Sequence, residues 1–190
     1  MGIIKSAEAE NDSVLNIAKL MLTAARTAPK AGHDDSITTA IITGDDKDRL
    51  RDGIKEKSRF RDAQGVQDAD VVVLIGVKWG KPTESRFSRE VKLVDLGIAV
   101  GSAVKTASIH NADNRIMLSV GETARQMELL DGDYMLGIPI SIKGKNIFFD
   151  RLPPSLEHHV YHLLPEHGDL REFDGELVLD KIVENRKTQK

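Results

Sequence analysis

The chain has 190 residues, with 27 lysines and arginines against 30 aspartates and glutamates, and it has no cysteine. The formal net charge of −3 gives no global basic field that would hold nucleic acid or anionic lipid. Without cysteine, this chain cannot supply a disulfide, a thiolate nucleophile, a zinc–thiolate site or the ligands of a cysteine-bound iron–sulfur cluster.

The first residues are acidic where a secretory signal would need an apolar core, and no apolar run approaches the length of a membrane span. We therefore expect a cytoplasmic protein that binds neither membrane nor nucleic acid. At this length one complete hydrophobic core is the default.

A helix is predicted over residues 14–26, capped by Asn11, Asp12 or Ser13 and ending before Pro29. The loop that follows combines cations, a hydroxyl group and a glycine, at Arg26, Thr27, Lys30, Gly32 and His33. Such a loop between a helix and a strand could hold a phosphate. An ordinary solvated turn is the alternative.

Three further elements follow. Residues 36–44 are rich in β-branched side chains, which predicts a strand. Residues 45–64 are densely charged and predict one exposed amphipathic helix. Residues 66–78 contain a continuous apolar run that predicts a central strand buried on both faces. The polar loop beyond it holds Trp79, interpreted as a packing anchor rather than a ligand platform.

The segment Leu93–Ala107 predicts a central helix, in which Asp95 is the single charge before residue 105. A helix that is apolar on every side is expected to be buried. Gly97 and Gly101 lie four residues apart on one face, so another backbone or a flat ligand could approach closely. Tight helix packing, within one chain or across a dimer, and a wall beside a planar cofactor are both consistent with this pattern.

Beyond this helix, Asn111, Asp113 and Asn114 supply turn and cap chemistry, and residues 116–127 resume helical spacing. Two strands are then predicted, Tyr134–Ile142 and Ile147–Arg151. Helices that alternate with strands in this way indicate an α/β layer architecture.

Residues 152–190 differ in composition and predict an arm that packs on the body, residues 1–151, or on a second subunit. His158 and His162 have the i, i+4 spacing of metal ligands. No glutamate lies between them in the zinc-protease arrangement, so no metal is assigned.

Several long motifs carry a resemblance, and they occur in the order AARTAPKAG, DADVVVLIGVK, KLVDLGIAVGSAVKTAS, ADNRIM and GIPISIKGKNIFFDR. Over Ile17–Arg151 the chain resembles a family of uncharacterised prokaryotic proteins described as containing a ferredoxin domain. Those relatives carry a cysteine-rich insert where this chain has residues 79–91. Because the chain has no cysteine, we expect no iron–sulfur cluster.

The chain also resembles, more distantly, the nitroreductase fold. The matching parts are an Ala-Pro loop, the long central helix and a late Gly-x-Pro, here Ala28-Pro29, Leu93–Ala107 and Gly137-Ile138-Pro139. This resemblance implies an α/β (α+β) fold with a central, mostly antiparallel sheet, a long buried central helix and helices on both sides. It also implies a homodimer that holds FMN at the subunit interface.

The function implied by the resemblance is an FMN-binding oxidoreductase with a nicotinamide donor and an unknown substrate. The cofactor-binding residues would then be Arg26, Lys30 and Lys145 for the phosphate, Thr27 and Asn114 as hydrogen-bonding groups, His33 where nitroreductases usually have Asn, and Gly97 and Gly101 for close dimer packing. No acid, base or nucleophile can be named. The alternative is a cofactor-free binding or scaffold protein of the same fold.

Overall fold

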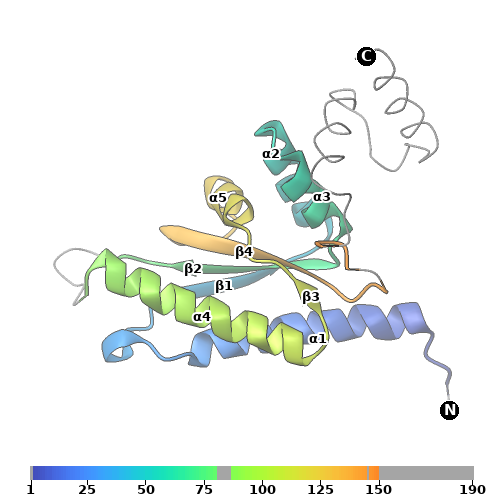
Figure 1. Ribbon diagram of the computed structural model, residues 1–190, viewed down its shortest axis with the longest axis horizontal. Coiled ribbons are helices and arrows are strands. Elements are labelled where there is room, and N and C mark those ends of the chain that lie inside the picture. The colour runs from blue at the N-terminus through green and yellow to red at the C-terminus, as the bar shows by residue number, and fades with distance from the viewer. Residues whose placement is uncertain (1, 81–86, 145, 150–190) are drawn as a thin grey trace, which may run out of the picture. The chain divides into compact units, whose positions relative to one another are not determined.

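The computed structural model describes residues 2–80, 87–144 and 146–149. All of these residues belong to the unit Met1–Phe149. They form a four-stranded antiparallel sheet with helices on both faces (Figure 1). The predicted fold class is confirmed.

The sheet has the strand order β1-β2-β4-β3. Its strands are β1 (Ile37–Ile42), β2 (Val71–Val77), β3 (Asp113–Asn114) and β4 (Tyr134–Ser141). Antiparallel pairing places Leu74 of β2 opposite Ala40 on one side and Gly137 on the other. Every residue of β2 is buried, which confirms the predicted central strand.

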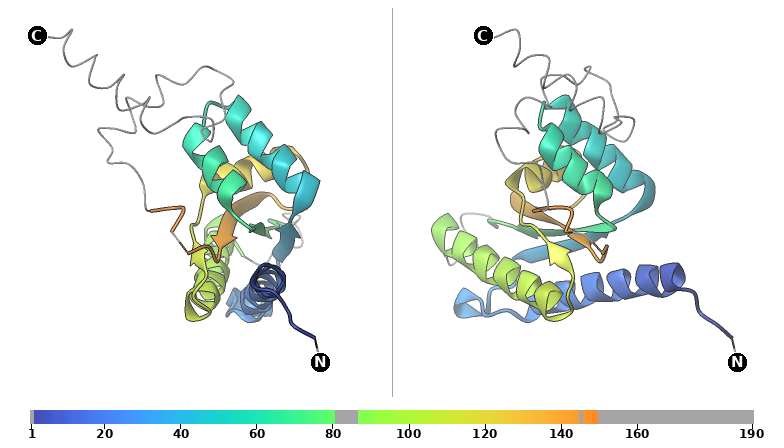
Figure 2. Two further views of the ribbon diagram at one scale, coloured as in Figure 1. Left: turned by 90° about the vertical axis from the view of Figure 1, so that its right-hand side faces the viewer. Right: turned by 45° about the vertical axis from the view of Figure 1, so that its right-hand side comes forward.

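Two hydrophobic cores form, one on each face of the sheet. Helices α1 (Ser6–Thr27) and α4 (Arg89–Ile109) cover one face, and α2 (Gly44–Glu56), α3 (Phe60–Asp68) and α5 (Leu118–Gln126) cover the other (Figure 2). Alternation along β2 directs Val73 and Ile75 into the first core and Val72 and Leu74 into the second. Each such side chain contributes roughly 1.5–3 kcal/mol when fully buried.

The charged segment after β1 differs from its prediction. It forms two helices, α2 and α3, instead of one. The break falls at residues 57–59, where Ser58 has a left-handed backbone with φ of 56°. Leu50 and Ile54 of α2 are nevertheless fully buried, so the amphipathic character is confirmed.

The central helix α4 is confirmed, but the expectation that it is buried on every side is corrected. Its sheet-facing side is buried, with Leu96, Ala99 and Ala103 in the core. On the opposite side, Val94 is 61% exposed and Ile98 is 39% exposed. The sheet and α1 together cover only one side of a helix that is apolar all round. Among the described residues, no helix is both long enough and apolar enough to cross a membrane.

At the end of the described part, residues 147–149 form a turn instead of the first residues of the predicted strand. The cause is local, because Oδ1 of Asn146 accepts hydrogen bonds from the backbone N–H groups of Phe148 and Phe149, at 3.0 and 3.1 Å. Residues 150–190, with the predicted arm and its His158 and His162, lie outside the described residues. Within the described ranges, no group of three or more potential metal ligands occurs.

Candidate functional site

The loop between α1 and β1 is fixed to the N-terminal half of α4 by two charged side chains of that helix. Asp95 is buried, and its carboxylate oxygens accept the backbone N–H of Ala31 at 3.0 and 3.3 Å. The buried Lys92 donates to Oδ2 of Asp34 at 2.8 Å. Lys92, just before the apolar stretch of α4, and Asp95, inside it, therefore anchor the loop in which a phosphate site was predicted.

The two cations predicted to bind phosphate have internal partners in this loop. Lys30 Nζ donates to the carbonyl oxygens of Arg26, Ala28 and Ala25 at 2.5, 2.9 and 3.5 Å, and its side chain is 6% exposed. Lys30 thus caps the C-terminal end of α1, where a cation is favoured. Arg26 Nη1 donates to Asp35 at 2.7 Å and to the carbonyl of Ile37 at 2.8 Å, yet its side chain is 46% exposed.

Thr27, the last residue of α1, and His33, in the loop that follows, are both exposed. The Thr27 hydroxyl donates to the carbonyl of Thr23 at 3.0 Å, and His33 has a positive φ of 61°. Between them, Gly32 has a φ of 57°, and a Cβ there would lie 2.5 Å from Cζ of Phe87. The left-handed backbone and the close contact with the Phe87 ring both favour glycine at this position.

The remaining predicted residues lie further along α4. Gly97 and Gly101 are on its exposed side, and a Cβ on either would meet nothing within 4 Å in the described part of the chain. Asn114 donates to Oγ of Ser108 at 3.4 Å, at the C-terminal end of the helix. With a rise of 1.5 Å per residue, Ser108 lies about 20 Å along the helix from Asp95. Within one chain the predicted cofactor-binding residues are therefore distributed along α4 and do not form one site. The last of them, Lys145, lies outside the described residues.

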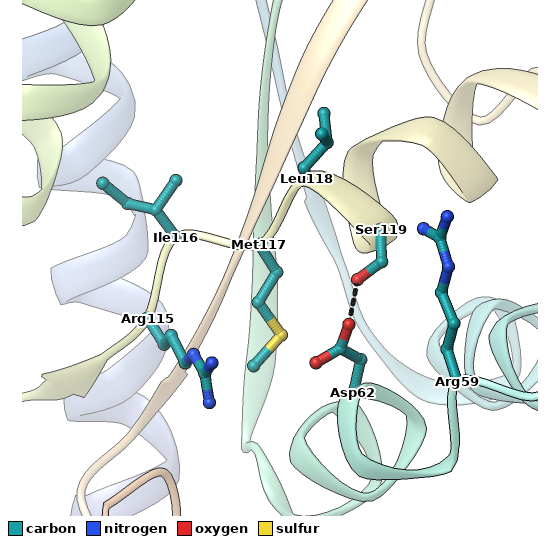
Figure 3. A pocket seen from close by; sticks show the side chains of 7 residues that line it. All are labelled: Arg59, Asp62, Arg115, Ile116, Met117, Leu118 and Ser119. Atoms are coloured by element: carbon teal, nitrogen blue, oxygen red, sulfur yellow. Dashed lines mark hydrogen bonds between the residues drawn. The ribbon is translucent and has the colours of Figure 1, made fainter.

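A separate pocket of about 290 Å³ lies on the other face of the sheet, between α3 and the start of α5 (Figure 3). Arg59 and Asp62 line it from the side of α3, and residues 115–119 line it from the segment that leads into α5. The pocket thus brings two arginines, one carboxylate and three apolar side chains together.

The charged groups of this pocket differ in how they are satisfied. Asp62 accepts a hydrogen bond from Oγ of Ser119 at 2.5 Å, and Arg59 pairs with Glu122 at 3.1 Å. Nη1 of Arg115 is buried and has no hydrogen-bond partner among the described residues. Its guanidinium carbon lies 5.9 Å from the centre of the Phe149 ring. Arg115 therefore lines the pocket as a residue, but its unsatisfied donor is buried and does not face the open space.

The wall that carries Arg115 is held rigidly against β4. Met117 and Gly137 exchange two backbone hydrogen bonds, of 2.8 and 3.1 Å. A Cβ on Gly121 would lie 2.1 Å from the carbonyl oxygen of Met135, so α5 packs on β4 at a distance that only glycine allows. On the α3 side, Gly65 leaves room for the Met117 side chain.

Sequence reasoning missed this pocket. Arg59 and Asp62 belong to a charged segment whose pattern predicts a solvated surface. Arg115 carried one signal, because it lies three residues before the start of α5, where a positive charge is unfavourable. A cation in that position indicates that something else compensates it.

Comparison with known sequences confirms the family resemblance. Residues 89–151 match a family described as "Uncharacterized protein containing a ferredoxin domain". An uncharacterised protein from Archaeoglobus fulgidus is 29% identical over an alignment of 181 residues, which covers 80% of this chain and 98% of that protein.

Solved structures similar to this chain have the nitroreductase-like fold. A protein from Desulfovibrio desulfuricans in complex with FMN superposes with a TM-score of 0.55 and 18% identity, over 81% of this chain and 85% of that one. An FMN-dependent nitroreductase from Mycobacterium smegmatis in complex with NADPH has a TM-score of 0.55 and 11% identity, over 73% and 83%. An NADPH:FMN oxidoreductase from Vibrio harveyi has a TM-score of 0.53 and 13% identity, over 92% and 75%. At these identities the likeness shows the fold alone.

Proposed function

We propose that the protein is a homodimeric FMN-binding oxidoreductase, with the cofactor beside the exposed side of α4. The observation that carries this proposal is the apolar surface of that helix, where Val94 and Ile98 are exposed and Gly97 and Gly101 leave open space. A second copy of the chain or a planar ring could approach the backbone closely there. The FMN-containing proteins of the same fold support this choice of cofactor.

The dimer is part of the proposal because one chain does not bring the predicted residues together. Arg26 and His33 lie at one end of α4, and Asn114 lies at the other. If two copies of α4 pack antiparallel through their exposed sides, the first end in one copy lies near the second end in its partner. A complete cofactor site would then form twice, related by two-fold symmetry.

The residues of this chain would bind and orient the cofactor. Arg26 would attract the phosphate with the exposed part of its guanidinium, and Gly97 and Gly101 would leave room for the ring. Lys92 and Asp95 would act indirectly, because they fix the loop that carries Arg26 and His33. When bound, FMN supplies hydride transfer between a nicotinamide donor and an acceptor.

One observation favours the alternative, a binding or scaffold protein without cofactor. The ammonium of Lys30 donates to three carbonyl oxygens and its side chain is 6% exposed, so it presents no donor to a phosphate. Of the two described cations predicted to bind the phosphate, Arg26 is then the one that is exposed enough to neutralise it.

A visible absorption spectrum, recorded before and after incubation with FMN and dialysis, decides between the two. Retained flavin bands that are lost in Arg26→Ala and kept in Arg49→Ala would support the proposal. Arg49 is a suitable control because it is exposed and pairs within α2, with Asp46. A spectrum that stays flat after incubation would favour the scaffold protein.

Sedimentation measures the dimer independently of the cofactor. Val94→Glu places a charge on the proposed interface, where the wild-type side chain is 61% exposed. Phe60→Glu is the matched control on the opposite face of the sheet, where Phe60 is 40% exposed. We expect Val94→Glu to be monomeric and Phe60→Glu to remain dimeric. A wild-type mass of one chain, 21.0 kDa, would contradict the dimer.

A further inference from the structure

We infer that two copies of α4 pack antiparallel in one defined register, with Glu90 of each copy beside Lys105 of its partner. The inference rests on the proposed homodimer and specifies how the exposed side of α4 recognises a second copy of the same chain. It is carried by the order of charges, apolar side chains and glycines along that side.

The charges stand near the two ends of the exposed side. Glu90 and Lys105 are both exposed, and neither has an oppositely charged group within ion-pair distance among the described residues. Fifteen residues separate them, so they lie about 22 Å apart along the helix and about 60° apart around it. They are therefore on one side of α4 and too far apart to pair within one chain.

A two-fold axis determines which of these charges meet. In a parallel pair of helices each residue lies beside its own copy, which would bring two Glu90 carboxylates together and two Lys105 ammonium groups together. In an antiparallel pair whose axis passes between residues 97 and 98, Glu90 lies opposite the partner's Lys105, and the axis repeats this pair. Opposite charges in facing positions favour the antiparallel arrangement and this register.

The uncharged residues of the exposed side fit the same axis. Val94, which is 61% exposed, lies opposite the partner's Gly101. Ile98, which is 39% exposed, lies opposite the partner's Gly97. A Cβ on either glycine would meet nothing within 4 Å in the described part of the chain, so both positions can receive a side chain. Each protruding apolar side chain thus faces a gap, with apolar contacts at the centre of the helix pair and charges at its rim.

This register also brings the two halves of the proposed cofactor site together. Ser108 accepts a hydrogen bond from Asn114, and it lies opposite the partner's Phe87. The Phe87 ring packs closely over Gly32, in the loop after α1. Because the glycine gaps of α4 then hold side chains of the partner, the proposed flavin ring lies at the ends of the helix pair, between Asn114 of one copy and the loop of the other.

Charge reversal tests the register, and the dissociation constant of the dimer is measured by sedimentation at low ionic strength. Glu90→Lys and Lys105→Glu each bring like charges together at both ends of the helix pair. We expect each to raise the dissociation constant about 10- to 100-fold. The double variant Glu90→Lys/Lys105→Glu restores opposite charges and should dimerise as the wild type does. Glu56→Lys is the control, because Glu56 is exposed at the end of α2, on the opposite face of the sheet.

Mixing the two single variants gives a second test, which does not depend on the double variant. A pair made of one copy of each has opposite charges at both ends, so a heterodimer should form from two solutions that are each largely monomeric. A double variant that dimerises no better than the single variants, or a mixture that stays monomeric, would overturn the register. An equal effect of Glu56→Lys would overturn it as well, because net charge would then be the cause.

The same experiment distinguishes this inference from the proposed function. A wild-type mass of one chain would refute the proposed dimer and the register with it. A wild-type dimer that Glu90→Lys and Lys105→Glu leave unchanged would overturn the register alone. Because the spectrum with FMN is a separate measurement, a failure to bind FMN would refute the proposed cofactor and leave the dimer and its register standing.

Discussion

Replacing Gly121 with alanine tests how closely α5 packs on the sheet. The added Cβ would lie 2.1 Å from the carbonyl oxygen of Met135, 2.5 Å from its carbonyl carbon and 2.6 Å from Cα of Leu136. These are backbone atoms of β4, which pairs with β2 and cannot yield. Carbon atoms pack at about 3.5–4.0 Å, so α5 must withdraw by roughly 1 Å. We expect a loss of about 1–3 kcal/mol, the usual cost of overpacking, against a gain of up to about 1 kcal/mol from helix propensity.

Urea unfolding measures this loss, and Gly53→Ala is the control. Gly53 is also inside a helix and faces α5, but its Cβ would meet Sδ of Met127 and Cγ2 of Thr123, both at 3.1 Å. Both contacts are with side-chain atoms and are about 1 Å longer than the backbone contact at Gly121, so Gly53→Ala should cost less than Gly121→Ala. Equal free energies of unfolding for the two variants would refute the packing argument.

Three further variants test other contacts. Gly101→Ala should stabilise the monomer by up to about 1 kcal/mol, since the added Cβ meets no described atom within 4 Å. The same Cβ should raise the dissociation constant of the proposed dimer, measured by sedimentation. Asp34→Ala should lower the unfolding free energy in urea more than Lys92→Met does. Asp34→Ala leaves the buried ammonium of Lys92 unpaired, whereas Lys92→Met leaves only the Asp34 carboxylate, which is 38% exposed to water. Equal losses in the two variants would contradict this. Burial lowers the pKa of Lys47, so the unfolded chain binds more protons as the pH approaches 10.5, and Lys47 contributes more stability as pH rises. The unfolding free energy of the wild type should therefore increase relative to Lys47→Met as the pH rises toward 10.5, and a decrease would be inconsistent with the lowered pKa.

The fold could be predicted because its strongest patterns are local. The continuous apolar run of β2 and the β-branched run of β1 each specify a strand without help from the rest of the chain. The boundaries were less predictable. Asn11, Asp12 and Ser13 looked like caps, but all three lie within α1, which begins at Ser6. Good capping residues permit a helix start but do not require one.

The roles of single cations could not be predicted, because they depend on what surrounds them. Lys30 and Arg26 had the composition of a phosphate site, yet Lys30 meets the carbonyl groups of its own helix end. The burial of Arg115 Nη1 could not be predicted either, because it follows from the packing of the segment between β3 and α5. Long-range contacts decide whether a charge has a partner, and the sequence does not encode them locally.

The one-sided burial of α4 follows from its composition and from the architecture together. A helix that is apolar all round needs apolar cover on every side, but a three-layer arrangement provides it on one side only. In this chain α1 and the sheet cover the side with Leu96 and Ala103, and Val94 and Ile98 remain exposed. Alanine or leucine in place of Gly97 and Gly101 would give the isolated chain a better helix. Glycine at both positions is explained if a flat group or a second backbone packs against the helix there, and this is why the dimer and the cofactor are proposed at the same surface.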